Sequence, residues 1–204
     1  MVSSCDLVSR TDISTQLIHF TKGNTWDDAF RRLQKIIGEG TILGSNHLIK
    51  GGVPCVCMSE APVQSLMDGL RNYTGYTRYS PFGIMFDKVW AFSRGGRPAI
   101  YEPDAEFELL TESNRWRHVR YEPTMTPAID FTWEREWRIP VSELNFGSGD
   151  AVIVVPSREL ADQLVREHDL NQDYEIWQYS QIMDPSVAES YREAFPWDIK
   201  VLSE

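Results

Sequence analysis

Apolar residues recur along the chain with two different spacings, which change from segment to segment. Residues 16–21 form a short apolar run that is typical of a buried strand. Over residues 26–37 the apolar side chains repeat at intervals of three and four, which predicts a helix with one core-facing side. Asn24 or Thr25 stands where the N-cap of this helix is expected.

The rest of the chain continues with short strands and separate helices. Further strands are predicted at 41–43, 53–58, 82–86, 98–101, 116–121, 151–155 and 174–177. Further helices are predicted at 62–71, in part of 102–114, after Ser157 and from Pro185 to about Phe195. This order favours a single α+β domain with a mostly antiparallel sheet over residues 15–204, preceded by a polar leader, residues 1–14.

Composition restricts the possible functions. The chain has a net charge of −10 and a pI near 4.9, which argues against a surface that coats nucleic acid. No apolar run reaches the roughly 18 residues that a membrane-spanning helix needs. The three cysteines do not form a disulfide framework. We therefore expect a reduced, cytoplasmic protein without a membrane partner.

The stretch 132–140 combines two tryptophans, two carboxylates and two arginines. If it is extended, successive side chains alternate between two faces. One face then carries Glu134, Glu136 and Arg138, and the other carries both tryptophans. Two interpretations are open: an edge strand whose solvent face is ion-paired, or a strand that presents paired carboxylates to a functional site.

Three segments, taken in order, resemble the ADP-ribosyltransferase fold. They are the first strand with His19-Phe20-Thr21, the strands 55–59 and 82–86 with an aromatic loop between them, and the late strand with its glutamates. The similarity is to the branch with a histidine, an aromatic residue and a glutamate, which includes diphtheria-toxin-like, PARP-like and DarT-type enzymes. It implies a split, mostly antiparallel sheet and an enzyme that consumes NAD.

The chain is also similar to a bacterial family found among phage-defence and toxin-like proteins. The shared marks are Cys57-Met58-Ser59-Glu60, the strand from Gly83 to Phe86, and the Glu-x-Glu-Trp-Arg segment from Glu134 to Arg138. This resemblance covers about residues 16–155. It implies a bacterial toxin or a phage-defence effector of the abortive-infection kind.

The resemblance also implies roles for single residues. Glu136 would stabilise the positive charge that develops on the ribose as nicotinamide leaves, with Glu134 as the alternative catalytic residue. His19 would form a hydrogen bond to NAD, with Thr21 beside it. One of Tyr73, Tyr76, Tyr79 or Phe82 would stack on the nicotinamide. Arg31, Arg32, Arg78 or Arg97 would hold the pyrophosphate. No metal is expected, and the acceptor of ADP-ribose, on a protein or a nucleic acid, is left open.

Two other functions compete with this hypothesis. The first is a non-catalytic, antitoxin-type protein on the same fold, in which Trp133 and Trp137 would anchor a protein partner. The second is a metal-dependent nuclease that uses Asp130, Glu134 and Glu136.

Overall fold

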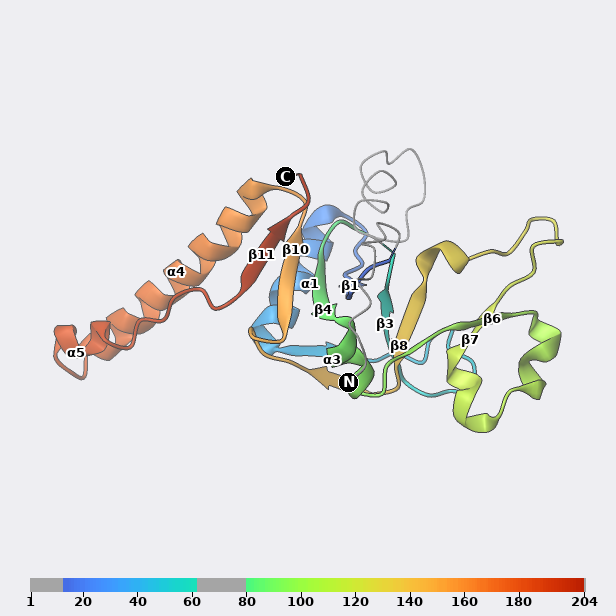
Figure 1. Ribbon diagram of the computed structural model, residues 1–204. Coiled ribbons are helices and arrows are strands. Elements are labelled where there is room, and N and C mark those ends of the chain that lie inside the picture. Colours follow the sequence, from blue (N-terminus) through green and yellow to red (C-terminus); the bar gives the residue numbers. More distant parts are fainter. Residues whose placement is uncertain (1–12, 62–79, 204) are drawn as a thin grey trace, which may run out of the picture.

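The computed structural model describes residues 13–61 and 80–203 and combines helices with a mostly antiparallel sheet (Figure 1). The predicted α+β class is therefore confirmed. Residues 1–12 of the expected leader, the expected helix at 62–71 and the candidates Tyr73, Tyr76, Arg78 and Tyr79 lie outside the described residues.

The main sheet has seven strands in the order β11-β10-β4-β1-β3-β8-β5. Their bounds are β1 Gln16–Phe20, β3 Val56–Ser59, β4 Gly83–Asp87, β5 Arg97–Pro98, β8 Glu136–Ile139, β10 Ala151–Val155 and β11 Asp198–Val201. Only the pair β10–β11 is parallel in this sheet of the described chain. Two small sheets pair β2 (Thr41–Leu43) with β9 (Glu143–Asn145) and, in parallel, β6 (Ile100–Glu102) with β7 (His118–Arg120).

The helices flank the sheet and extend beyond it. They are α1 Trp26–Glu39, α3 Lys88–Ser93, α4 Arg158–Ser180, α5 Pro185–Glu189 and the 3-10 helices η1 Asp104–Leu109, η2 Glu112–Arg117 and η3 Thr132–Glu134. Local chemistry sets the ends of α1. The Thr25 hydroxyl accepts a hydrogen bond of 3.1 Å from the Asp28 N–H, and Gly40 ends the helix in the left-handed conformation.

Apolar side chains are buried on both faces of the main sheet. The larger cluster joins α1, through residues such as Leu33, to sheet residues such as Ile84 and Ile153. The smaller cluster, on the opposite face, includes Ile18 and Met85. Strands that are apolar on both faces explain why these segments appear as continuous hydrophobic runs in the sequence.

Gly83 shows why β4 begins with a glycine. A Cβ atom at this position would lie 2.7 Å from the carbonyl oxygen of His19, closer than real side chains approach backbone. Glycine therefore allows β4 to pair with β1 beside His19, where Gly83 stands opposite Phe20 in the register.

Several local predictions were wrong. Residues 174–177 belong to α4, not to a strand, because Ile176 alone of these four is buried and the helical period continues through them. The expected bend after β4 is the helix α3, which Asp87 caps through the N–H groups of Val89 and Trp90. The strands β9 and β11 were not predicted, and α5 ends at Glu189 rather than near Phe195.

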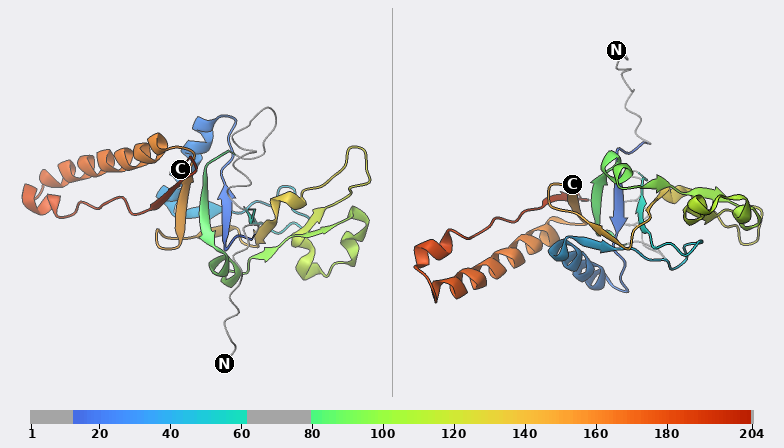
Figure 2. Two further views of the ribbon diagram at one scale, coloured as in Figure 1. Left: turned by 45° about the horizontal axis from the view of Figure 1, so that its top comes forward. Right: turned by 90° about the horizontal axis from the view of Figure 1, so that it is seen from below.

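Two extensions leave the main sheet in different directions (Figures 1 and 2). One is an arm made of α4, α5 and the segment that returns to β11. The other is a lobe made of β6, β7, η1 and η2. The beginning of α4 packs on the sheet through Ala161 and Leu164, which belong to the larger core cluster. Within residues 13–61 and 80–203, no helix is both long and apolar enough to cross a membrane.

The position of Ile153 in the centre of the core leads to a stability prediction. This side chain is fully buried, so Ile153→Ala should lower the free energy of unfolding by about 2–5 kcal/mol through lost burial and a residual cavity. Urea denaturation measures the change. The control Val89→Ala, at a position that is 74% exposed on α3, should change it by no more than about 0.5 kcal/mol. Equal effects of the two substitutions would contradict the described core.

Candidate functional site

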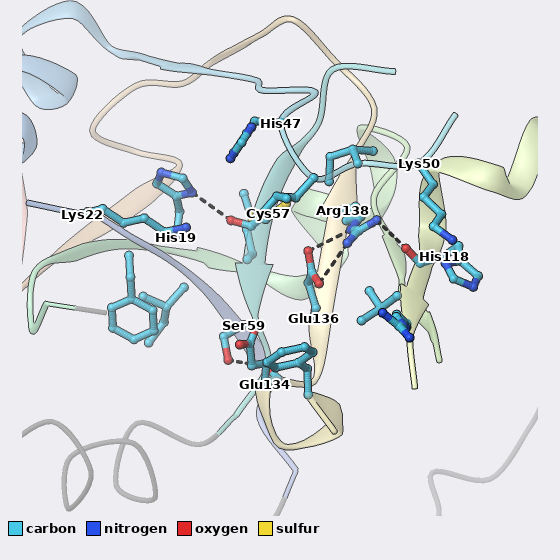
Figure 3. A pocket seen from close by; sticks show the side chains of 18 of the residues that line it. His19, Lys22, His47, Lys50, Cys57, Ser59, His118, Glu134, Glu136 and Arg138 are labelled. Atoms are coloured by element: carbon cyan, nitrogen blue, oxygen red, sulfur yellow. Dashed lines mark hydrogen bonds and ion pairs between the residues drawn. The ribbon is translucent and has the colours of Figure 1, made fainter. Parts of the chain in front are cut away.

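A pocket of about 390 Å³ lies where the main sheet meets the lobe and the loop 46–50. Its volume is within the range of about 300–1,000 Å³ that is usual for small-molecule sites. The polar side chains that line it are Lys22, His19, His47, Lys50, Cys57, Ser59, Asp104, His118, Arg120, Glu134, Glu136 and Arg138. Figure 3 shows His19 and Lys22 at one end, Glu136 and Arg138 in the middle, and Lys50 and His118 at the other end.

Strand alternation explains why one face of β3 and β8 is polar. Trp137 and Ile139 of β8 point into the larger core cluster, so Glu136 and Arg138 point the opposite way. The register pairs Glu136 with Ser59 and Arg138 with Cys57 across the two strands. These four side chains therefore line the pocket together.

Arg138 is the centre of the polar network. Its Nε and Nη2 atoms donate to the two carboxylate oxygens of Glu136, at 2.8 and 3.2 Å. Its Nη1 donates to the backbone carbonyls of Trp116 and His118, at 2.6 and 3.0 Å. The side chains of Arg138 and Glu136 are only 5% and 14% exposed. Burial opposes the charge of Arg138, but Glu136 outweighs it and raises the pKa of Arg138.

His19 lies on β1 next to the register pair that joins β1 to β3. Strands β1 and β3 share the register pair Ile18 and Ser59. Next to this pair, the Nδ1 atom of His19 lies 2.8 Å from the carbonyl oxygen of Cys57. Burial lowers the pKa of His19, the hydrogen bond to Cys57 opposes this, and the charge of Lys22 adds to it. A carbonyl can only accept, so Nδ1 carries the proton and the neutral ring keeps Nε2 as an acceptor.

Glu134 lines the pocket, but its backbone is not the extended strand that was predicted. The stretch 132–140 is not extended throughout, because Thr132–Glu134 forms η3 and Arg135 is left-handed, with φ at 44°. The Ser59 hydroxyl donates to the Glu134 carbonyl at 2.6 Å, and the Glu60 N–H donates to the Arg135 carbonyl at 3.1 Å. These bonds fix the turn on β3, so that Glu134 is buried and still lines the same pocket as Glu136.

The lobe end of the pocket is rich in charged groups. Lys50 Nζ lies 2.6 Å from Asp104, and Arg120 donates to Glu122. His118 is 2% exposed, and its Nε2 lies 3.4 Å from the carbonyl of Pro103. The cations at this end are therefore mostly paired with carboxylates, which leaves the pocket mixed in charge rather than strongly basic.

The cysteines near the pocket are poor nucleophiles. Cys55 and Cys57 are free thiols. Burial raises the pKa of Cys55 to about 11, and burial together with the charge of Glu136 raises the pKa of Cys57 even further. Both shifts favour the protonated thiol at neutral pH, whereas a nucleophilic cysteine has a lowered pKa.

The structure brings together some of the predicted site residues and separates others. His19, Glu134 and Glu136 line one pocket. Thr21 and Phe82 are buried in the interior instead and are not among the lining residues. The Thr21 hydroxyl lies within hydrogen-bond distance of the carbonyls of Ala29 and Phe82, and the Phe82 ring packs on Trp26 and Phe30. Neither side chain is placed to touch a ligand in this pocket.

Most of the remaining pocket residues are not marked by any motif in the sequence. His47, Lys50 and His118 come from a polar loop and from the lobe, and no local motif marks them. Arg138 was placed correctly beside the glutamates, but its bonds to the lobe had no signal in the sequence. Among the described residues that line the pocket, Phe131 has an aromatic side chain that is partly exposed.

The carboxylates proposed for a nuclease do not form one group. Asp130 accepts hydrogen bonds from the N–H and the hydroxyl of Thr132, and it is not among the residues that line the pocket. Within the described part of the chain, no cluster of three or more His, Cys, Asp or Glu side chains is arranged to hold a metal ion. The nuclease hypothesis therefore has no geometric support in these residues.

Comparison with known proteins identified no relative of this chain. No protein-family model matches the chain, and no curated protein or solved structure matches it. The resemblance to ADP-ribosyltransferases therefore stays a prediction from the motifs.

The buried ion pair leads to a stability prediction. Arg138→Met should lower the free energy of unfolding by about 3–5 kcal/mol, because it leaves the buried Glu136 carboxylate and two carbonyls without their donor. Arg138→Lys should recover part of this loss, since it keeps the charge but not the fork geometry.

The matched control for this prediction is Arg31→Met. The pair of Arg31 with Asp28 is largely exposed, so its loss should cost much less stability than the loss of Arg138. Denaturant unfolding of the three variants measures the difference. If Arg138→Met were no more destabilising than Arg31→Met, the network would not hold the lobe to the sheet.

The partly buried side chain of His19 leads to a pH prediction. The pKa of His19 is lower in the folded protein than its ordinary value of 6.5, so below pH 6.5 the unfolded chain takes up a proton that the folded chain does not. Its contribution to stability is therefore lost as the pH falls from 6.5 towards the folded pKa. His19→Asn keeps an N–H for the Cys57 carbonyl and cannot be protonated.

The measurement is the free energy of unfolding at several pH values between about 7 and 5. The wild type should lose more stability over this range than His19→Asn does. Parallel curves for the two proteins would show that His19 does not titrate below its ordinary pKa.

Proposed function

We propose that this protein is an NAD-consuming enzyme of the ADP-ribosyltransferase type, which breaks the bond between nicotinamide and ribose. The observation that carries the proposal is that His19 of the first strand and Glu136 of the late strand line one pocket, with Glu134 beside them. In the sequence these residues are far apart, and the motif resemblance requires them to meet.

The chemistry requires a group that stabilises positive charge. When nicotinamide leaves with the bonding electron pair, the ribose becomes oxocarbenium-like, and a nearby carboxylate lowers the energy of that state. In this proposal Glu136 has that role. Its ion pair with Arg138 keeps it oriented, at 2.8 Å from Nε. Glu134, held by Ser59 at its backbone, remains the alternative catalytic carboxylate.

In this proposal His19 binds the ribose of NAD and orients it. Its Nδ1–H is used by the Cys57 carbonyl, so the Nε2 atom of the neutral ring can accept a hydrogen bond from a ribose hydroxyl. Lys22, near the same end of the pocket, supplies positive charge for the pyrophosphate. Phe131, which lines the pocket, takes the place of Phe82 as the aromatic side chain that stacks on nicotinamide in this proposal.

In the proposed reaction one bond to the ribose carbon forms and one breaks. Water or an acceptor nucleophile on a protein or nucleic acid attacks the ribose carbon, nicotinamide is released, and one proton is lost from the nucleophile. The motif resemblance further suggests a toxin or phage-defence role. We place this activity in the cytoplasm, where NAD is abundant and where the free thiols of Cys55 and Cys57 stay reduced.

The direct test incubates the purified protein with NAD and measures released nicotinamide by chromatography. The wild type should release nicotinamide, and Glu136→Gln should slow release by on the order of 100-fold, since it removes the charge that stabilises the reacting ribose. If Glu134→Gln causes this loss and Glu136→Gln does not, Glu134 is the catalytic carboxylate. The matched control is Glu143→Gln, because Glu143 is exposed on β9 and does not line the pocket. It should release nicotinamide at the wild-type rate.

Binding is measured separately from turnover. NAD should raise the unfolding temperature of the wild type, because a ligand that binds only the folded state stabilises it. If NAD causes no shift and the protein releases no nicotinamide, the enzyme proposal is wrong. A shift without release would instead identify the pocket as a non-catalytic NAD site.

A further inference from the structure

The outward face of α4 carries a stripe of large apolar side chains, which we call the arm stripe. It consists of Leu170, Tyr174 and Trp177, which are 66%, 60% and 57% exposed. Their spacing of four and then three residues places them on one side of the helix. The rings of Tyr174 and Trp177 stack, with centroids 5.9 Å apart. The three side chains thus follow one side of the helix, and two of them are in contact.

The rest of α4 already has its packing partners. At its beginning, Ala161 and Leu164 belong to the main core. Farther out, His168 Nε2 contacts the carbonyl of Glu193 at 3.0 Å, and Gln172 accepts from the Glu193 N–H at 2.9 Å. The helix therefore uses its inner side for the sheet and for the returning chain.

The returning chain also braces the outer half of the arm. Arg192 lies 2.8 Å from Asp173, and the ring of Tyr191 packs on Tyr179. Figures 1 and 2 show this half of α4 beyond the sheet, accompanied by α5 and the returning segment. A braced helix that still exposes a stacked Tyr–Trp pair has the properties of a binding surface, because large aromatic side chains are the usual anchors of protein interfaces.

The charges around the arm stripe indicate the chemistry of its partner. Over Arg158–Ser180, α4 has six acidic and two basic residues, a net charge of −4. Another copy of this acidic arm, an anionic membrane and a nucleic acid would all be repelled. A positively charged partner is attracted, and its cations can also lie over the faces of Tyr174 and Trp177.

We propose that the arm stripe binds a basic amphipathic helix of another protein. The apolar side of that helix covers Leu170, Tyr174 and Trp177, and its lysine or arginine residues face carboxylates such as Asp169. This surface lies on a different element from the pocket, so the proposal does not depend on the enzyme activity. In this proposal the arm binds a protein partner, and the pocket holds the reacting groups.

The test uses the full-length protein and a fluorescent synthetic peptide of leucine and lysine with helical amphipathic spacing. Fluorescence anisotropy at low salt measures binding. The wild type should bind the peptide, and Tyr174→Ala combined with Trp177→Ala should weaken binding at least about tenfold. Asp169→Asn should weaken it less, and added salt should weaken it further.

Two controls make the result specific. Val89→Ala combined with Leu109→Ala removes side chains that are 74% and 81% exposed outside the arm, and it should bind like the wild type. A scrambled peptide of the same composition, which has no apolar face, should bind at least about tenfold more weakly than the amphipathic one. Circular dichroism melting should show that all variants remain folded.

Three outcomes would overturn the proposal. The first is equal binding by the wild type and the Tyr174→Ala, Trp177→Ala variant. The second is equal binding of the scrambled and amphipathic peptides, which would mean attraction by charge alone. The third is a wild-type dimer in sedimentation that the same variant converts to a monomer, which would identify a second copy as the occupant.

Discussion

The bidentate contact between Arg138 and Glu136 is the interaction on which the site depends. One guanidinium binds the carboxylate of the late strand and also the carbonyls of Trp116 and His118, so it joins the lobe to the main sheet. Because both side chains are nearly buried, each charge requires the other to offset its loss of water. The pocket exists where this contact holds the lobe against β3 and β8.

The same contact determines what Glu136 can do. A carboxylate fixed by two nitrogen atoms cannot rotate freely, but each oxygen can still accept a further hydrogen bond, and Glu136 lines the pocket. Across the pocket, the partly buried ring of His19 directs its Nδ1 proton to the Cys57 carbonyl, and burial lowers its pKa. The site therefore pairs an oriented negative charge with a hydrogen-bond acceptor, and the proposed NAD chemistry uses both.

The pocket and the arm are two regions of the molecule with different chemistry. The pocket mixes cations and carboxylates that are mostly paired, whereas the arm is acidic and exposes a stacked aromatic pair. The overall charge of −10 conceals this difference. An acidic arm with an apolar stripe provides a way to select one partner without affecting the polar network that shapes the pocket.

The sequence by itself determined the elements that depend on local contacts. The capped helix α1, the strands β1, β3, β4 and β10, and the α+β class follow from apolar spacing, a capping threonine and glycine positions, all of which act over a few residues. The meeting of His19 with Glu136 was expected only through a family resemblance. Only the tertiary structure showed that Glu134 reaches the pocket through a 3-10 turn and that Thr21 and Phe82 are interior residues. It also showed that Arg138 holds the lobe. These features could not be predicted because they depend on contacts between segments far apart in the chain, for which residue spacing carries no information.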